Sequence, residues 1–490
     1  MSDARAQSLW RSESLGPVRL TLLAGAAGIV CGLIATRSLV LGAALLVGLA
    51  LAVVGVMMPM LTWQASLVFL LLVSSYVPTL LGGLVLWGSF SVFVIGCWLE
   101  HWESGRRIDW ISPTLWVWIA LWMMWGVVSL LHALDPSEGI KELTRYAISF
   151  GVLLTWINWV RTPAQIRKTV EWTWGLMTLV GVGIVLQLIG QRIIPRLSLM
   201  GPYAPTPGDI AMMITPMLPL AATLWLSRTD PQRWRGLLPL VIVLVGMYGC
   251  QSRSADLGSA VGILVGMWCL RPQWRGRLIG LSLAGAALIA AALLIKYGDL
   301  RQGLILNLSG RNLVWTAALH AIREHPLVGI GPGSWRLWLE QHYVTLDFLM
   351  PDLHGNTYVL SPDLLGGEAH SLYLTKAAEM GVPSLIGLIG ILVAWAGAVR
   401  RAMSRIPEGW LRAAAIGSIA STTGMIVYGF FEHGPIIGRA RGGEVLVVWM
   451  VMMLPMLAAR ATQQPGANDA LDASTAGRFM TPVAAEGSAA

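Results

Sequence analysis

Long apolar runs separated by short polar segments dominate the sequence. A run of about 20 apolar residues is long enough to cross a bilayer as a helix. Such runs lie near residues 18–36, 38–60, 64–81, 83–99, 113–132, 145–160, 170–190, 209–227, 237–250, 255–270, 277–297, 383–400, 411–431 and 443–459. The pattern predicts an all-α polytopic membrane protein with about 14 transmembrane helices, or about 12 if the short runs within 64–99 and 237–270 are fused.

The composition agrees with this class. Only 12% of the 490 residues are charged and 55% are hydrophobic, whereas a soluble chain carries about 25% charged residues. Lys and Arg do not cluster as they do on nucleic-acid-binding surfaces, so we expect no nucleic-acid partner. The four cysteines lie in or beside apolar runs without metal-ligand spacing, and we expect them to be packing residues.

Basic residues predict which side of the membrane each loop faces. If residues 1–17 are cytoplasmic and the spans alternate, most of the 34 Lys and Arg fall in cytoplasmic segments, as the positive-inside rule requires. Both termini are then cytoplasmic. The first apolar run is too long for a cleavable signal peptide, so we interpret it as a retained anchor.

The same reading divides the chain into five parts. Residues 1–17 form a cytoplasmic segment, 18–297 hold the first eleven spans, 383–460 hold the last three, and 461–490 form a disordered cytoplasmic tail. Residues 298–382 form one large periplasmic loop, which we expect to fold as a small helical cap because long structureless loops are uncommon. The cytoplasmic loops are too short for a nucleotide-binding domain, and no phosphate-loop motif occurs.

Unusual charges collect at the predicted outer ends of spans, against the positive-inside trend. They are Arg192, Arg196, Asp209, Arg253, Asp256, Arg311, Glu368 and His370. None of the apolar runs has a charge at its middle, where an ion-coupled transporter usually carries one. The pattern therefore favours an anion-binding site at the outer membrane surface over an exporter without chemistry.

Two arginines are candidate phosphate ligands. Arg253 lies in a short hairpin between two short spans, where it either pairs with Asp256, reaches lipid headgroups or binds a phosphate. Arg311 directly precedes an amphipathic helix predicted over 312–324. A cation at a helix amino terminus opposes the helix dipole, and this is favourable beside a bound anion.

His370 is the candidate general base. It opens a segment that reads as a short helix closed by Gly381 and Pro383. In a first helical turn the positive helix end holds a histidine neutral, so that it can accept a proton; a structural role is the alternative. The spacing of His342, His354 and His370 matches no metal motif, so we expect no metal.

Three ordered stretches resemble the O-antigen ligase and polymerase superfamily. They are Ser252-Arg253-Ser254, then Ser309-Gly310-Arg311 through Glu324-His325-Pro326 to the glycines of 329–333, and finally Ala369-His370-Ser371-Leu372-Tyr373 through Glu379-Met380-Gly381. The resemblance covers roughly residues 200–400. Relatives often carry Asn where this chain has Asp209, so Asp209 is given no role. The glycines of 329–333 follow a helix and include Pro332, so we predict a tight turn there and no dinucleotide site.

The resemblance implies a GT-C-like fold and a metal-independent, inverting glycosyltransferase of the bacterial inner membrane without a cofactor. Its donor would be a glycan on undecaprenyl diphosphate at the periplasmic side. By the same resemblance Arg253 and Arg311 would bind the diphosphate, and His370 would take the proton of the acceptor hydroxyl. Tyr373 would line the same pocket, Arg192 is a further substrate-binding candidate, and Glu379 is expected to be structural.

Several acceptors fit these motifs. Lipid A–core as acceptor would make the protein an O-antigen ligase, which we favour. A second lipid-linked glycan would make it a polymerase of O-antigen or exopolysaccharide, and a protein hydroxyl is a further possibility. In each case the partners are membrane lipids and lipid-linked glycans, and ligase and polymerase share the motifs quoted above.

Overall fold

The computed structural model of the chain describes residues 63–64, 79–105, 107–193, 207–228, 236–250, 252–297, 311–344, 349–351, 357–359, 369–432 and 444–463. The predicted spans 18–36 and 38–60, nearly all of 64–81, the segment 1–17 and nearly all of the tail 461–490 lie outside these residues. Each of the other predicted spans coincides with one or two helices.

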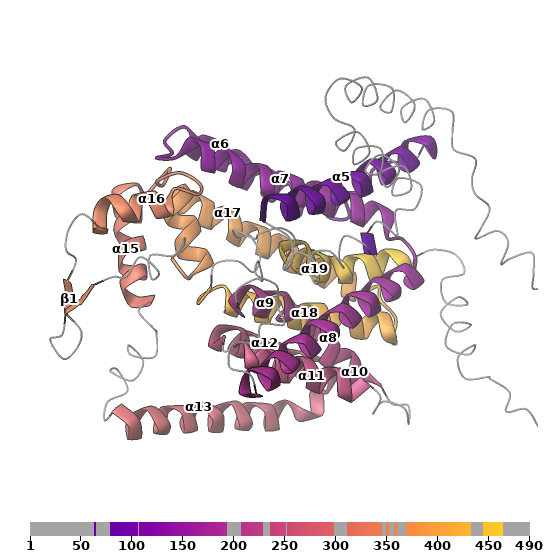
Figure 1. Ribbon diagram of the computed structural model, residues 1–490. Helices are drawn as coiled ribbons and strands as arrows, with labels where there is room; N and C mark the ends of the chain where they lie inside the picture. The colour runs from indigo at the N-terminus through magenta and orange to yellow at the C-terminus, as the bar shows by residue number, and fades with distance from the viewer. Residues whose placement is uncertain are drawn as a thin grey trace, which may run out of the picture.

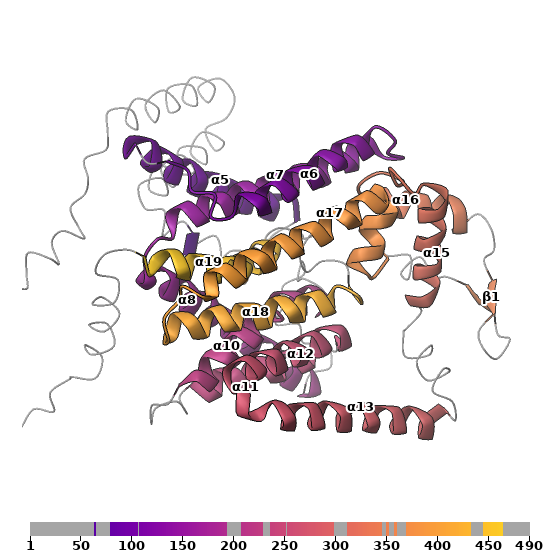
Figure 2. The ribbon, with the colours of Figure 1, turned by 180° about the vertical axis from the view of Figure 1, so that it is seen from behind.

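The helices form one elongated bundle (Figures 1 and 2). They are α5 (Thr79–Glu103), α6 (Pro113–Leu130), α7 (Pro136–Trp159), α8 (Pro163–Ile193), α9 (Pro207–Ile214), α10 (Met217–Ser227), α11 (Leu237–Gly249), α12 (Arg253–Leu270), α13 (Arg275–Tyr297), α17 (Leu372–Met403), α18 (Trp410–Tyr428) and α19 (Glu444–Ala461), with a 3-10 turn at Pro272–Trp274. Several are long and apolar enough to cross a membrane, as the all-α membrane class requires.

The exposure of side chains shows that α19 lies inside the bundle and α13 at its edge. From Leu446 to Ala459 every residue of α19 is buried, as expected for a helix that is apolar on all sides and lies inside a bundle. By contrast α13 lies along one edge of the bundle (Figure 1), and its Leu288 and Ile295 are 71% and 87% exposed. Such a surface is suited to lipid.

Glycines bring α12 and α18 into close contact. A Cβ on Gly258 would lie 2.7 Å from the carbonyl oxygen of Gly424, and a Cβ on Gly262 would lie 2.8 Å from that of Ala420. Small residues at such crossings let two membrane helices approach backbone to backbone. Because the contacts run in opposite directions along the two helices, the start of α12 and the end of α18 lie at the same end of the bundle.

A second, smaller core lies at that end. It contains α15 (Arg311–Glu324), α16 (Trp335–Leu339) and a π-helical turn (Glu340–Val344), and its buried side chains include Ala318, Trp335 and Trp338. Two short antiparallel strands follow, β1 (Leu349–Pro351) and β2 (Thr357–Val359), with Met350 opposite Tyr358. These strands were not expected in a helical cap.

One predicted span is divided between two helices, and another is merged with the short helix predicted before it. The run 209–227 is interrupted at Thr215 and Pro216, which separate α9 from α10. The predicted short helix and the span after it are merged in α17, with a break at Gly381, whose φ is 76°. We call residues 372–380, before this break, the α17 arm. A side chain at Gly381 would collide with the carbonyl oxygen of Leu327, 1.9 Å from its Cβ.

Candidate active site

Three charged or titratable side chains form a chain of contacts at the cap end of the bundle. The Nη2 of Arg311 donates a hydrogen bond to Oε1 of Glu432 at 2.8 Å. The Nδ1 of His370 lies 3.3 Å from Oε2 of the same carboxylate. The Glu432 side chain is 15% exposed and that of His370 is 36% exposed, so the carboxylate is largely enclosed while the imidazole is accessible.

Each of these residues stands at the end of a helix. Arg311 is the first residue of α15, His370 directly precedes the α17 arm and its N-cap, and Glu432 follows the end of α18. The backbone N–H of Leu372 donates to the carbonyl oxygens of both Gly429 and Glu432, at 2.8 and 2.9 Å. The start of the α17 arm is therefore attached to the end of α18 by its backbone, independently of the side chains of the site.

The backbone at His370 is held in a conformation that a non-glycine residue seldom adopts. Its φ is 48°, and left-handed residues of this kind cluster at functional sites. Ser371 is the N-cap, with its side chain accepting from the N–H of Leu374. His370 thus lies outside the first helical turn, where the sequence had placed it, and its ring contacts Glu432.

The contact between His370 and Glu432 suits a general base. A carboxylate on one ring nitrogen favours the tautomer with its proton on Nδ1, which leaves the lone pair of Nε2 available to accept a proton. The carboxylate also stabilises the imidazolium that forms. Because a guanidinium has five N–H donors, Arg311 can bind Glu432 and still offer others to an anion.

The other two predicted substrate-binding arginines can be located in their helices. Arg253 is the first residue of α12 and is exposed, and the antiparallel packing of α12 on α18 puts it at the same end of the bundle as Glu432. Arg192 belongs to the last turn of α8. Their roles as substrate ligands remain predictions.

Tyr373 is turned toward α18. Its hydroxyl donates to the carbonyl oxygen of Ile426 at 2.9 Å, and its ring lies 4.6 Å from that of Phe430. These contacts give Tyr373 a structural part in attaching the α17 arm to α18, and its predicted contact with substrate remains untested.

The glycine-rich segment forms a tight turn, as predicted. Gly329, Gly331 and Gly333 all have positive φ, at 68°, 99° and 70°. A Cβ on Gly329 would lie 2.4 Å from the carbonyl carbon of Glu379, so the turn needs glycine to pack on the α17 arm. The N–H of Gly331 donates to the backbone oxygen of Glu379, and the N–H of Gly333 donates to its carboxylate. The predicted structural role of Glu379 agrees with these bonds.

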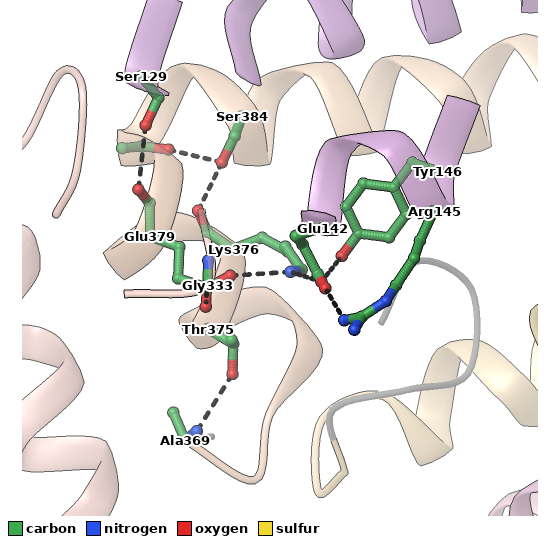
Figure 3. Close-up of polar contacts among 11 residues, drawn as sticks. Ser129, Glu142, Arg145, Tyr146, Gly333, Ala369, Thr375, Lys376, Glu379 and Ser384 are labelled. Atoms are coloured by element: carbon green, nitrogen blue, oxygen red, sulfur yellow. Dashed lines mark hydrogen bonds and ion pairs between the residues drawn. The ribbon is translucent and has the colours of Figure 1, made fainter. Parts of the chain in front are cut away.

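A buried group of charges surrounds Glu379 (Figure 3). The Nζ of Lys376 lies 2.9 Å from Oε2 of Glu379 and 3.5 Å from Oε1 of Glu142, which also accepts a hydrogen bond from the hydroxyl of Tyr146. Lys376 and Glu142 went unnoticed in the sequence because both lie just outside the apolar runs 145–160 and 383–400. In the structure α7 and α17 extend past those runs and enclose the two residues.

Glu432 also escaped the sequence reasoning. It lies one residue beyond the predicted span 411–431, on the predicted outer side, and so belonged with the outer charges. Its contacts depend on the packing of α17 against α18, which the sequence pattern does not give.

The histidines considered above as metal ligands, and set aside for their spacing, are described only in part. The Nδ1 of His342 lies 2.9 Å from the carbonyl oxygen of Trp338, and its ring stacks on that of Trp338. His354 is outside the described residues. Within the described ranges, no group of three His, Cys, Asp or Glu side chains is arranged to hold a metal ion.

Part of the chain is similar to a known family. Residues 238–389 match the family model described as O-antigen ligase. The match confirms the resemblance to the O-antigen ligase and polymerase superfamily. It includes Arg253, Arg311 and His370, whereas Glu142 and Glu432 lie outside it. Members of this family are glycosyltransferase-like ligases and polymerases that act on lipid-linked glycans, in agreement with a multi-pass membrane protein. A search of curated proteins gave no match.

Proposed function

We propose that the protein is an inverting O-antigen ligase of the bacterial inner membrane. It transfers a glycan from undecaprenyl diphosphate to a hydroxyl of lipid A–core on the periplasmic side. The observation that carries this proposal is the chain of contacts Arg311–Glu432–His370, which joins a cation, a carboxylate and an accessible imidazole within or beside the O-antigen ligase match. The proposed reaction uses no metal ion or other cofactor.

The reaction is a single displacement. Nε2 of His370 removes the proton of the acceptor hydroxyl as its oxygen forms a bond to the anomeric carbon of the donor sugar. The bond from that carbon to the phosphate oxygen breaks, and its electron pair leaves with undecaprenyl diphosphate. Attack opposite the leaving group inverts the anomeric centre. Glu432 holds the imidazole in position and stabilises its positive charge.

The arginines act on the leaving group. Negative charge builds up on the diphosphate as the glycosidic bond breaks, and fixed cations stabilise it best in an enclosed site. Arg311, oriented by Glu432, presents its other N–H donors to this charge, and Arg253 binds the diphosphate from the start of α12. Bidentate guanidinium–phosphate pairing suits this task.

Glu432 serves both halves of the reaction. One carboxylate oxygen orients Arg311 and the other meets His370. A single carboxylate therefore sets the relative position of the leaving-group cation and the base, which is why we place Glu432 beside the residues implied by the family.

A transfer assay with two competing acceptors tests the function. The full chain in nanodiscs is given a glycan on undecaprenyl diphosphate together with lipid A–core, and the products are identified by mass spectrometry and anomeric analysis. We expect glycan on lipid A–core with an inverted linkage, formed about 10²–10⁴-fold more slowly by His370→Ala. Products made only of longer lipid-linked glycan would identify a polymerase, and no transfer by the wild type would reject the proposal.

Cysteine labelling tests the side of the membrane. In a cysteine-free background, Leu319→Cys on the exposed surface of α15 should react with an impermeant maleimide in intact spheroplasts. The matched site Ser404→Cys, which is also exposed, should react only after permeabilisation. The opposite pattern would place the site in the cytoplasm and contradict the proposal.

A further inference from the structure

Three charged side chains that the proposed reaction does not use are enclosed at the outer end of the bundle. Glu142, Lys376 and Glu379, which we call the buried ion cluster, are 1%, 2% and 1% exposed. Removing charges from water is costly unless they are paired and hydrogen-bonded. A pair of nonpolar residues would fill this space without that cost, so the cluster calls for a reason beyond stability.

The buried ion cluster joins three parts of the molecule (Figure 3). Glu142 belongs to α7, Lys376 and Glu379 belong to the α17 arm, and the Glu379 carboxylate accepts from the N–H of Gly333 in the glycine-rich turn at 3.1 Å. Arg145 reaches Glu142 from the more exposed rim, 3.4 Å away. The cluster therefore connects the bundle, the arm and the cap at one point.

His370 lies two residues before the α17 arm, and the direction of the arm depends on its contacts. Gly381 has a non-helical backbone, so the rest of α17 does not extend through it as one rigid rod. The contacts at the Gly381 end include the indole N–H of Trp125, which donates to the carbonyl oxygen of Met380 at 2.9 Å, and the hydroxyl of Ser129, which donates to that of Glu379. The ammonium of Lys376, midway along the arm, provides its charged attachment to α7.

We propose that Lys376 is a positioning residue for His370, acting through Glu142 and Glu379. The inference rests on the proposed function of His370. Ion pairs in a low-dielectric interior are strong and sensitive to geometry. Lys376 pairs with Glu142 of α7, and Glu379, its partner on the arm, accepts from the N–H of Gly333 in the glycine-rich turn, so the arm is fixed from two sides. The cluster thereby sets the distance from the imidazole to the acceptor hydroxyl.

The most informative variant is Glu142→Gln. It keeps the shape of the side chain and an oxygen that accepts from Tyr146, but it removes the negative charge that α7 presents to Lys376. We expect kcat to fall about 10- to 100-fold while donor affinity stays the same, since small misplacements of a reacting group cost about this much. The kcat of Lys376→Met should fall further, because this variant leaves two buried carboxylates without their ammonium. If the Lys376→Met protein does not accumulate in the membrane, Glu142→Gln still tests the positioning role.

A double-mutant cycle separates positioning from stability. If Glu142 acts only through His370, Glu142→Gln should cost nothing more in a His370→Ala background, because the group that it positions is already gone. Asp109→Asn is the matched control. Asp109 pairs with Arg460 at 3.0 Å and touches neither His370 nor the cluster in any contact described above, so any loss of turnover that it causes should persist in the His370→Ala background.

Hydrogen–deuterium exchange supplies a readout that does not depend on catalysis. Residues 369–380 should exchange faster in Glu142→Gln than in wild type or in Asp109→Asn, in the full chain in nanodiscs. If the wild type transfers no glycan, the proposed function fails, and unchanged exchange in Glu142→Gln separately rejects the attachment. In an active enzyme, equal losses of turnover with and without His370, or no loss at all, would overturn the positioning role.

Discussion

His370 and Glu432 are 62 residues apart in the sequence, yet Nδ1 of the first lies 3.3 Å from Oε2 of the second. The backbone N–H of Leu372, two residues after His370, donates to the carbonyl oxygen of Glu432, so the main chain next to His370 is attached there as well. The imidazole is therefore oriented before any substrate binds. An oriented base loses less entropy on the way to the transition state than one that must first be ordered.

Replacing Glu432 tests this orientation. Glu432→Gln keeps the size of the side chain but removes the charge that stabilises the imidazolium and holds Arg311. We expect the single-turnover rate to fall by about 10²-fold or more, within the range of general acid–base effects, and donor affinity to fall less. A rate equal to that of wild type would show that Glu432 takes no part in the reaction.

The two arginines should affect donor binding. Arg253→Ala and Arg311→Ala should each weaken binding of the undecaprenyl-diphosphate donor by roughly 1.5–3 kcal/mol, the value of a lost charge-assisted hydrogen bond. Lysine at either position should rescue only in part, since an ammonium lacks the planar fork. If both arginines bind one diphosphate, as proposed, the double variant should be non-additive. Equilibrium binding of the donor measures these affinities. Losses of binding free energy that simply add in the double variant would contradict a shared diphosphate.

Much of the helical arrangement follows from the sequence. A chain in lipid must satisfy its backbone hydrogen bonds within each helix, so an apolar run of sufficient length predicts a helix. The described membrane helices between α5 and α19 coincide with such runs. The pattern does not show where a helix continues beyond its apolar run. For this reason the sequence did not predict that α7 starts as early as Pro136, or that α17 starts at Leu372 and continues into the span.

Some residues of the candidate site could be found from the sequence and others could not. Arg311 and His370 are visible in the sequence because a cation or a titratable group at the outer end of a span is unusual. Glu432 and Glu142 are not, since an acidic residue next to a span gains meaning only from its neighbours. The left-handed backbone of His370 is likewise hidden, because it results from the attachment of the α17 arm to α18.

The crossing of α12 and α18 predicts a contrast between two glycines. Gly424→Ala would put a Cβ 2.4 Å from the carbonyl oxygen of Gly258, so the helices must separate. We expect a loss of about 1–3 kcal/mol, as for other overpacked interiors. The control Gly285→Ala on α13, where nothing lies within 4 Å, should leave stability unchanged or slightly higher. Thermal unfolding in detergent measures both, and equal melting temperatures would contradict the packing.

The Asp109–Arg460 pair predicts a pH dependence. Burial alone would raise the pKa of Asp109, but hydrogen bonds from Ile111 and Arg460 and the charge of Arg460 outweigh it, and the pKa is lowered. The resulting stabilisation is complete above the ordinary aspartate pKa of about 4 and is lost as the pH falls through the lowered folded-state value. Near pH 7 the free energy of unfolding of Asp109→Asn should therefore be about 0.5–1 kcal/mol lower than that of wild type, as for a partly exposed ion pair. The difference should vanish in acid. A difference that does not shrink at all as the pH falls from about 7 to well below the ordinary aspartate pKa would contradict this origin.

In the proposed mechanism His370 accepts the proton of the acceptor hydroxyl at a site where arginines hold the donor. Donor affinity and single-turnover rate, measured on His370→Ala in nanodiscs, test it most directly. We expect donor binding like that of wild type and a turnover lower by about 10²–10⁴-fold. If His370→Ala instead abolishes donor binding, or reacts at the wild-type rate, His370 is not the base.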